Sequence, residues 1–286
     1  RVYAPVGSHE DLLPYLVRRL LENGANTSFV NRILDDRTPI AELVADPAEQ
    51  VLSLAQIPHP QIPLPAKLYP DRRNASGMDL SSYAALARLN SQWRIELAPA
   101  VPKPASAREI DMALSTVENG FDSWTATDVA VRARYLETMA ELLEARMPQL
   151  MALCTHEGGK TIADGVAEVR EAVDFCRYYA LRAREDFVQR RLPGPTGEDN
   201  QWQLRGRGVF VCISPWNFPL AIFIGQVSAA LVAGNTVVAK PAEQTPQVAM
   251  AAVALLYQAG IPQEALQLVV GGADVGAQLV SDRRVA

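Results

Sequence analysis

Apolar residues follow two different spacings in the C-terminal part of the chain. Residues 208–213 form a short apolar run, rich in β-branched residues and bounded by glycine and by a Ser-Pro pair, which is typical of a buried strand. Residues 219–232 are apolar almost all round and include several small side chains, as in a helix buried against a sheet. The Gly-Asn pair at 234–235 is a helix-stop signal, and residues 236–240 form a second buried strand. The pattern predicts one βαβ unit, in which a right-handed crossover joins two parallel strands.

Unusual polar residues follow each of these strands. The first strand is followed by Ser-Pro-Trp-Asn-Phe at 214–218, and the second ends in Lys-Pro-Ala-Glu at 240–243. A third strand is predicted over 266–270, followed by the glycine-rich turn 271–276. That turn departs from the G-x-G-x-x-G fingerprint because its first two glycines are adjacent, so alone it is a weak signal. Ligands of open parallel sheets bind outside the carboxyl ends of the strands, so we expect a binding site at this edge.

Four helices are predicted before the first strand, over residues 107–120, 127–146, 147–157 and 162–185. The first is expected to end at Asn119-Gly120, a helix-stop signal. The GGKT sequence at 158–161 invites a phosphate-loop interpretation, but position 154 is Cys where that loop requires Gly, and no strand precedes it. We therefore predict a helix end followed by a new helix. Residues 191–207 contain turn residues between two extended segments and predict a hairpin.

A helix is predicted over residues 10–23, and its polar stripe consists of Tyr15, Arg18, Arg19 and Glu22. Such a stripe is most often a solvated helix face. Two adjacent arginines near a tyrosine can instead clamp a carboxylate, because guanidinium groups pair with it bidentately. The pattern by itself leaves both interpretations open.

The segment between the two helical parts has a different composition. Short helices are predicted over residues 25–36 and 38–49, and the proline-dense stretch 57–70 predicts an extended, stiff connector rather than a partner-binding PxxP motif. Residues 71–79 predict a polar loop, and residues 80–88 a further helix. We place a domain boundary in this part of the chain.

The composition argues against several classes of protein. The chain has 286 residues, of which 49% are hydrophobic and 21% charged, as in ordinary globular domains, and its formal net charge is −5. No basic block stands out, so nucleic acid is not an expected partner. No apolar run reaches membrane-spanning length without a charge or a proline. Three widely spaced cysteines argue against a disulfide framework and fit a reducing compartment, and none has metal-ligand spacing with the three histidines.

Several sequence motifs carry a family resemblance. SPWNFP and AGNTVVAKPAEQTP resemble the aldehyde dehydrogenase superfamily, and EVREAVDFCRYYA and VFVCISPWNFPLAIFIGQV resemble its pyrroline-5-carboxylate dehydrogenase branch. The N-terminal YAPVGSHEDLLPYLVRRLLENGANTSFVNR resembles the end of a proline dehydrogenase barrel. One chain with both resembles the bifunctional proline-oxidising enzymes of the proline utilization A family.

The resemblance implies an α/β fold with three parts. Residues 1–36 would be the C-terminal end of a proline dehydrogenase (βα)8-type barrel, and residues 37–100 a proline-rich linker with short helices. Residues 101–286 would be the N-terminal, NAD-binding half of an aldehyde dehydrogenase domain, with a parallel sheet preceded by helices. We expect both chain ends to be cuts through folded domains of a longer protein.

The resemblance also implies roles for residues at the strand ends. In aldehyde dehydrogenases a cysteine thiolate attacks the aldehyde, and Asn217 would donate a hydrogen bond to the resulting oxyanion. The remaining residues would contact NAD, namely Ile213, Ser214, Trp216, Lys240, Glu243, Gly272 and Gly276. Lys240 and Glu243 would bind the adenosine ribose hydroxyls, and a carboxylate there disfavours the 2′-phosphate of NADP. Without the resemblance, Asn217 would be taken as a loop residue that satisfies backbone groups, and the Lys–Glu pair as a weak exposed ion pair.

The proline dehydrogenase resemblance implies a second set of residues. Arg18 and Arg19 would hold the carboxylate of proline, Tyr3 and Tyr15 would line that site, and Glu22 would lie near the flavin. Most of the FAD site would belong to barrel strands outside this chain.

The whole protein would oxidise proline to pyrroline-5-carboxylate with FAD and glutamate semialdehyde to glutamate with NAD. The catalytic cysteine and general-base glutamate of the family lie beyond the last residue, so we expect the fragment alone to be inactive. We further expect a cytoplasmic homo-oligomer that uses residues 191–207 at its subunit interface, with peripheral membrane association of the whole protein left open. Two alternatives remain: a fragment of a single-function aldehyde dehydrogenase with an unrelated N-terminal extension, and a non-catalytic truncated interaction module.

Overall fold

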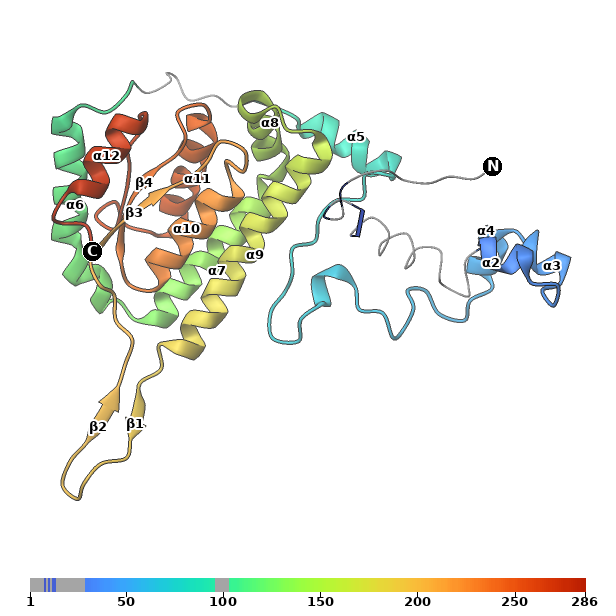
Figure 1. Cartoon of the computed structure of the whole chain (residues 1–286), viewed down its shortest axis with the longest axis horizontal. Coiled ribbons are helices and arrows are strands. Elements are labelled where there is room, and N and C mark those ends of the chain that lie inside the picture. Colours follow the sequence, from blue (N-terminus) through green and yellow to red (C-terminus); the bar gives the residue numbers. More distant parts are fainter. Residues whose placement is uncertain (1–7, 9, 11, 14–28, 96–102) are drawn as a thin grey trace. The chain divides into compact units, whose positions relative to one another are not determined.

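The computed structural model describes residues 8, 10, 12, 13, 29–95 and 103–286 (Figure 1). The chain divides into two compact units, Arg1–Ile62 and Pro63–Ala286. The described part of the first unit contains the helices α2 (Phe29–Leu34), α3 (Ile40–Leu43) and α4 (Pro47–Leu52). The sequence predicted one helix over 38–49, which is wrong: the side chain of Asp46 accepts a hydrogen bond from the Ala48 amide and begins a new helix with proline in its first turn.

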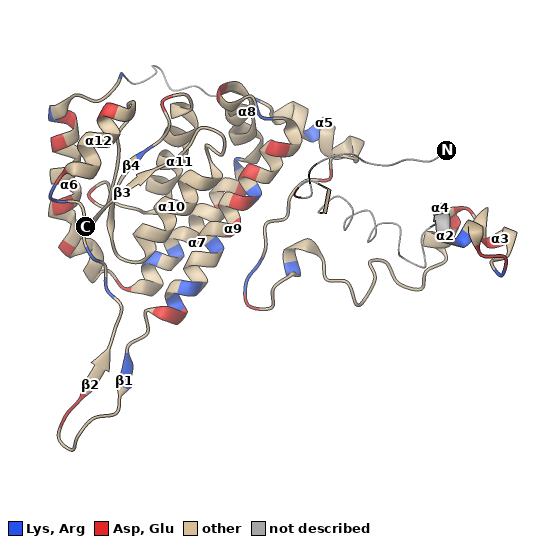
Figure 2. Ribbon diagram, in the orientation of Figure 1, with Lys and Arg blue, Asp and Glu red and all other residues tan. Residues whose placement is uncertain are grey.

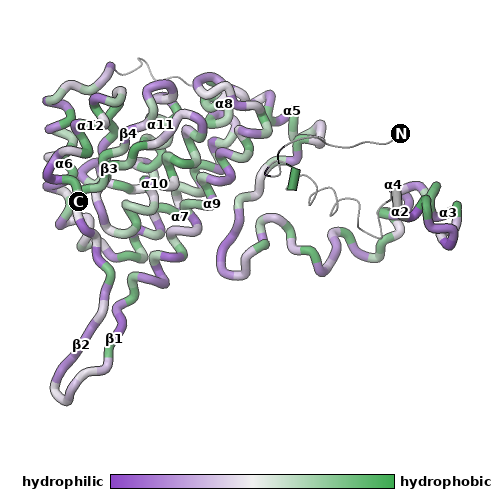
Figure 3. The backbone as a smooth tube through the Cα atoms, viewed as in Figure 1, coloured by the Kyte–Doolittle hydropathy of each residue, from purple (hydrophilic) through white to green (hydrophobic). Residues whose placement is uncertain are grey.

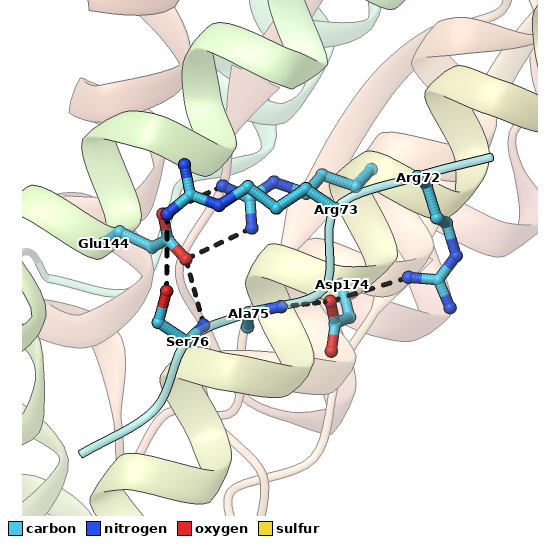
Figure 4. Close-up of polar contacts among 7 residues, drawn as sticks. Arg72, Arg73, Ala75, Ser76, Glu144 and Asp174 are labelled. Carbon is cyan, nitrogen blue, oxygen red and sulfur yellow. Dashed lines mark hydrogen bonds and ion pairs between the residues drawn. The ribbon is translucent and has the colours of Figure 1, made fainter. Parts of the chain in front are cut away.

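The linker part of the second unit contains the 3₁₀ turn η1 (Pro65–Lys67) and the helix α5 (Tyr83–Gln92). The segment between them, predicted as a polar loop, has no regular structure but is anchored to the helical body (Figure 4). The Ala75 amide donates to Asp174 Oδ1 at 2.9 Å, and the Ser76 amide donates to Glu144 Oε1 at 3.3 Å. Arg72 forms an ion pair with Asp174 at 3.6 Å. Because Ala75 is fully buried, this segment is part of the core.

Four long helices precede the parallel sheet, namely α6 (Ala107–Ala126), α7 (Val129–Ala145), α8 (Met147–Gly158) and α9 (Ile162–Asp186). Three agree with the prediction to within two residues at each end, but α6 does not end at Asn119-Gly120 as the sequence suggested. Gly120 lies inside the helix and is buried against the backbone of Glu264, where an added Cβ would overlap the carbonyl oxygen. The glycine therefore allows a close approach between segments and does not end the helix.

The turn between α8 and α9 forms as predicted for the GGKT sequence. Gly159 ends α8 in the left-handed region, with φ of 64°. Thr161 begins α9 through a capping box with Asp164, whose carboxylate accepts a hydrogen bond from the Thr161 amide. The segment is a helix–turn–helix corner and not a phosphate loop.

The C-terminal part is a three-stranded parallel sheet in the order β3-β4-β5, made of β3 (Val209–Ile213), β4 (Thr236–Lys240) and β5 (Leu266–Leu268). The helices α10 (Ala221–Val232) and α11 (Pro246–Ala259) connect the strands, and α12 (Ala273–Ser281) follows β5. The predicted βαβ unit is confirmed, and every residue of the central strand β4 is buried, as expected for a sheet covered on both faces.

The helices form a layer on each face of the sheet (Figure 1). Side chains of β4 alternate between two apolar clusters: Val238 packs with α6 and α12, whereas Val237 and Ala239 pack with α7, α9, α10 and α11. Figure 3 shows hydrophobic positions concentrated in the parallel sheet around β3 and β4, whereas β1 and β2 are largely hydrophilic. Basic and acidic residues are interspersed along α7 and α9, where Arg177 and Glu144 pair at 2.8 Å (Figure 2). No helix in the described ranges is long and apolar enough to cross a membrane.

A hairpin made of β1 (Arg190–Leu192) and β2 (Asn200–Trp202) extends away from the helical body (Figure 1). Its strands are antiparallel, with Arg190 opposite Trp202 and Leu192 opposite Asn200. The Arg190 guanidinium lies 5.5 Å from the centre of the Trp202 ring. The hairpin predicted over residues 191–207 is present.

Candidate cofactor and catalytic site

The carboxyl ends of β3 and β4 meet next to the first turns of α12. Ile213 and Lys240, the last residues of the two strands, are partners in the parallel register, and the Ser214 amide donates to the Lys240 carbonyl at 3.1 Å. Gly276 lies against both side chains: a Cβ built on it would be 3.7 Å from Lys240 Cδ and 3.8 Å from Ile213 Cδ1. The structure therefore brings four of the predicted cofactor residues together.

Lys240 and Glu243 have different surroundings. Lys240 is only 5% exposed, and its ammonium donates to the Pro241 carbonyl at 3.1 Å. Glu243 is exposed, and its carboxylate accepts a hydrogen bond from the Gln244 side chain at 3.2 Å. The two side chains form no ion pair with each other, so the alternative of a simple Lys–Glu surface pair does not describe this loop.

Ser214 and Gly272 complete the surroundings of this site. Ser214 is 5% exposed, and within the described part of the chain its hydroxyl has no hydrogen-bond partner. Gly272 precedes α12, and its carbonyl accepts from the Gly276 amide at 3.2 Å, so the two glycines are one helical turn apart. A buried hydroxyl without a partner among the described residues, an exposed carboxylate and two glycines one helical turn apart are features that suit the polar and planar parts of a dinucleotide.

Asn217 and Trp216 lie on the exposed loop between β3 and α10. Trp216 is 56% exposed and Asn217 is also exposed. The Asn217 carboxamide makes no hydrogen bond to any described residue, which leaves both its N–H groups available to a ligand. Both residues follow β3, whose last residue, Ile213, belongs to the cluster with Lys240 and Gly276. They lie on the loop and not in that cluster.

Two glutamates, which the sequence analysis did not single out, support this edge of the sheet: Glu168 is buried and Glu157 is half-buried. Glu157 of α8 accepts the amides of Gln247 and Val248, both at 2.9 Å, and so caps the start of α11. Burial raises the pKa of the Glu157 carboxyl, although these two amides oppose that effect. Glu168 of α9 accepts the amide of Ala221 at 2.9 Å and caps α10.

Each glutamate had a weak sequence signal. Glu168 interrupts the apolar face that contains Val166 and Val169, and a charge at such a position requires a partner. Glu157 ends the apolar helix α8 directly before the glycine turn. Their partners are about 50 and 90 residues away, so no local spacing could have identified them.

The three cysteines are all buried. All are at most 7% exposed, and burial raises the pKa of each thiol to about 12, namely those of Cys154, Cys176 and Cys212. A thiolate nucleophile needs an exposed, electropositive surrounding, and none of these three positions provides one. Cys176 is a fully buried small side chain in α9, as the sequence predicted.

The predicted proline-site residues lie outside the described residues, namely Tyr3, Tyr15, Arg18, Arg19 and Glu22. Their roles stay predictions from the sequence. Among the described residues, no group of three or more His, Cys, Asp or Glu side chains could hold a metal ion.

Comparison with known proteins identifies the family. The sequence profile of the aldehyde dehydrogenase family matches residues 99–286, which is well over half of the chain. The chain belongs to the aldehyde dehydrogenase family. The proline dehydrogenase profile matches residues 1–32 of the same chain. Both halves of the predicted resemblance are therefore confirmed, as is the expected α/β fold with a parallel sheet.

Named relatives carry one or both of these parts. The chain is 49% identical to "Bifunctional protein PutA" of Klebsiella aerogenes, in an alignment that covers 100% of this chain and 24% of that protein. It is 38% identical to "1-pyrroline-5-carboxylate dehydrogenase 1" of Halalkalibacterium halodurans, over 59% of this chain and 33% of that protein. The chain thus spans about a quarter of the length of its bifunctional relatives.

Solved structures agree with this grouping. A crystal structure of bifunctional proline utilization A superposes with a TM-score of 0.77 at 51% identity, covering 100% of this chain and 29% of that one. A variant of Thermus thermophilus 1-pyrroline-5-carboxylate dehydrogenase superposes with a TM-score of 0.68 at 29% identity, covering 74% of this chain and 48% of that one.

Proposed function

We propose that this chain is the junction of a bifunctional proline-catabolic enzyme, which oxidises proline to pyrroline-5-carboxylate with FAD and glutamate semialdehyde to glutamate with NAD. The observation that carries the proposal is the occurrence of both profiles in one chain, the proline dehydrogenase profile at residues 1–32 and the aldehyde dehydrogenase profile at residues 99–286. A single-function aldehyde dehydrogenase with an unrelated extension leaves the first match unexplained. The division of the chain into 1–36, 37–100 and 101–286 is part of the proposal.

The proposed NAD site is the edge at which β3 and β4 end. Ile213, Lys240 and Gly276 form its floor, and Ser214 offers a buried hydroxyl that has no partner among the described residues. The exposed carboxylate of Glu243 would accept hydrogen bonds from the adenosine ribose hydroxyls, with Lys240 beside it. The same carboxylate would repel a 2′-phosphate, which favours NAD over NADP. Gly272 and Trp216 would complete the contacts.

The proposed catalytic residue of this chain is Asn217. A neutral carboxamide is a suitable oxyanion donor because it is fixed in direction and does not titrate. When bound, NAD would accept the hydride that leaves the aldehyde carbon. The thiolate that attacks the aldehyde would come from outside this chain, because Cys154, Cys176 and Cys212 are all buried. The isolated chain would accordingly be inactive as a dehydrogenase.

Two further parts of the proposal concern substrates and assembly. Proline would be held at its carboxylate by Arg18 and Arg19, with Tyr3, Tyr15 and Glu22 around proline and flavin. The β1–β2 hairpin would form the contact of a homo-oligomer, since Leu192 and Trp202 are 47% and 41% exposed on it.

The experiment uses the native protein that contains this sequence and follows two separate reactions. Dye reduction by proline reports the first activity, and NADH formation from glutamate semialdehyde reports the second. Asn217→Ala should lower kcat for the second reaction by roughly 100-fold or more, as removal of one oxyanion donor does elsewhere, and leave proline oxidation unchanged.

The matched control is Asn90→Ala, which removes an exposed carboxamide from α5. It should affect neither reaction. Equal NADH formation by the Asn217→Ala and Asn90→Ala variants would remove Asn217 from the catalytic machinery.

A further inference from the structure

A buried ion pair connects the α8–α9 turn to the loop that carries Asn217. Lys160 Nζ lies 3.0 Å from Glu168 Oε1, and the two side chains are 15% and 1% exposed. Burying an unpaired carboxylate costs several kcal/mol, so each charge here depends on the other. Lys160 belongs to the GGKT sequence, which does not form a phosphate loop.

Glu168 uses its second oxygen to fix the start of α10. Glu168 Oε2 accepts the amides of Leu220 at 3.3 Å and Ala221 at 2.9 Å. Leu220 itself cannot cap the helix, because its side chain has no acceptor. The cap therefore comes from α9, and the negative charge lies at the positive end of the helix dipole.

Lys160 reaches the residue that follows Asn217. Its ammonium lies 4.3 Å from the centre of the Phe218 ring, within the range of a cation–π contact. The α8–α9 turn also packs against the loop between β3 and α10. A Cβ on Gly158 would be 3.7 Å from Pro219 Cγ and 3.9 Å from the Trp216 carbonyl oxygen. Residues 218–221 thus contact the Lys160–Glu168 ion pair, and Pro219 also packs against Gly158.

We infer that Lys160 and Glu168 are positioning residues, which fix the backbone of residues 218–221 so that the Asn217 carboxamide points in one direction. The inference rests on the proposed function, in which Asn217 stabilises an oxyanion. A donor of this kind works only when it is held within a fraction of an ångström, and a shift of 1 Å can cost about 100-fold in rate. Loss of the pair should therefore lower kcat much more than it weakens NAD binding, because the proposed contacts of Lys240, Glu243, Gly272 and Gly276 with NAD lie outside the loop that the pair holds.

The test compares two variants of the native protein that contains this sequence. Lys160→Met keeps most of the length of the unbranched side chain and removes its charge, which leaves Glu168 unpaired. Lys160→Arg restores a cation that can pair with Glu168 and lie over Phe218. For Lys160→Met we expect kcat for glutamate semialdehyde oxidation to fall roughly 10- to 100-fold, with a much smaller change in the Kd of NAD. For Lys160→Arg we expect most of the rate to return.

The matched control removes an exposed ion pair from the same helix. Arg184 of α9 pairs with Glu137 at side-chain exposures of 36% and 45%. Arg184→Met should leave kcat and NAD affinity unchanged, because an exposed pair of this kind contributes little.

Hydrogen exchange at the amides of Leu220 and Ala221 gives a readout that does not depend on activity. In Lys160→Met these amides should exchange faster than in the wild type, and in Lys160→Arg they should be protected again. Unchanged exchange in Lys160→Met overturns the inference, as does faster exchange without a fall in kcat. A parallel loss of NAD affinity and kcat also overturns it, since that result indicates a general structural defect.

The two proposals can fail separately. If the wild type forms no NADH from glutamate semialdehyde, the proposed function fails and the catalytic part of this inference fails with it. The exchange at Leu220 and Ala221 then still decides whether the ion pair holds the loop.

Discussion

Replacing Gly276 by alanine separates the stability of the apo fold from cofactor binding. The new Cβ would lie 3.7 Å from Lys240 Cδ and 3.8 Å from Ile213 Cδ1, which are ordinary van der Waals distances. Gly276 lies inside α12, where alanine is favoured over glycine by roughly 0.5–1 kcal/mol. The free energy of unfolding of the apoprotein should therefore stay equal or rise by about that amount.

The same substitution should weaken the binding of NAD. If the adenosine part of NAD packs over Gly276 beside Lys240, an added methyl group overpacks that contact, at a cost of roughly 1–3 kcal/mol. A cost of about 1.4 kcal/mol corresponds to a tenfold higher Kd. At saturating NAD the ligand-induced gain in stability should then shrink by the same amount, because that gain follows the ratio of ligand concentration to Kd.

The assay is a calorimetric NAD titration of the native protein, together with its urea midpoint with and without NAD. Ala277→Gly is the matched control: it removes a methyl group from the exposed neighbouring position, so it should lower apo stability by up to about 1 kcal/mol and leave Kd unchanged. A Gly276→Ala protein that keeps both its fold and its NAD affinity would refute the placement of NAD at this glycine.

Three further predictions concern the fold and its charges. Gly120→Ala should lower the free energy of unfolding by roughly 1–3 kcal/mol, because its Cβ would meet the Glu264 backbone. The measurement is the urea midpoint, which should fall, and a higher midpoint would contradict the close approach. Iodoacetamide at about pH 8 should label the three cysteines at least about tenfold more slowly in native than in urea-unfolded protein, and rapid native labelling would contradict their burial. Burial acts to raise the pKa of Glu144, but Arg177 together with the Ser76 amide lowers it overall. Ionised Glu144 therefore stabilises the fold above the unfolded-state pKa, and this contribution is lost as pH falls through the lower folded-state pKa. Glu144→Gln should thus cost more at pH 7 than at about pH 3 in urea unfolding, whereas a pH-independent cost would contradict this sign.

The strands and helices of the βαβ unit could be predicted because their determinants are local. The apolar run over 208–213, the helix over 219–232 and the strand over 236–240 agree with β3, α10 and β4 to within two residues. Short β-branched runs, a continuous apolar helix and a Gly-Asn stop each specify their structure without reference to distant residues.

Two features that the sequence did not show depend on distant contacts. Asn119-Gly120 has the composition of a helix end, but Gly120 lies inside α6, where the absence of a Cβ lets the backbone of Glu264 approach. Residues 71–79 have the composition of an exposed loop, but their amides and guanidinium groups meet Glu144 and Asp174 on two helices. Polar residues can line a buried segment when every charge is paired, and a sequence does not show the pairing.

The candidate site divides in the same way. Residues at the strand ends could be named from the sequence because the carboxyl ends of parallel strands meet at one edge. The residues that support that edge come from α8, α9 and the turn between them. Glu157 and Glu168 accept hydrogen bonds from backbone amides about 50 to 90 residues away, and Lys160 forms an ion pair with Glu168. Their role became visible only in the folded structure.

The most direct test of the central claim is a proline-driven NADH assay on the single purified native polypeptide. Proline, an electron acceptor for the flavin and NAD are supplied, and absorbance at the NADH band is followed. The account predicts that NADH appears after proline is added, and that Asn217→Ala slows NADH formation roughly 100-fold or more while proline oxidation continues. Proline oxidation by the wild type without NADH, or NADH formation from glutamate semialdehyde but not from proline, would contradict the claim that one chain joins both activities.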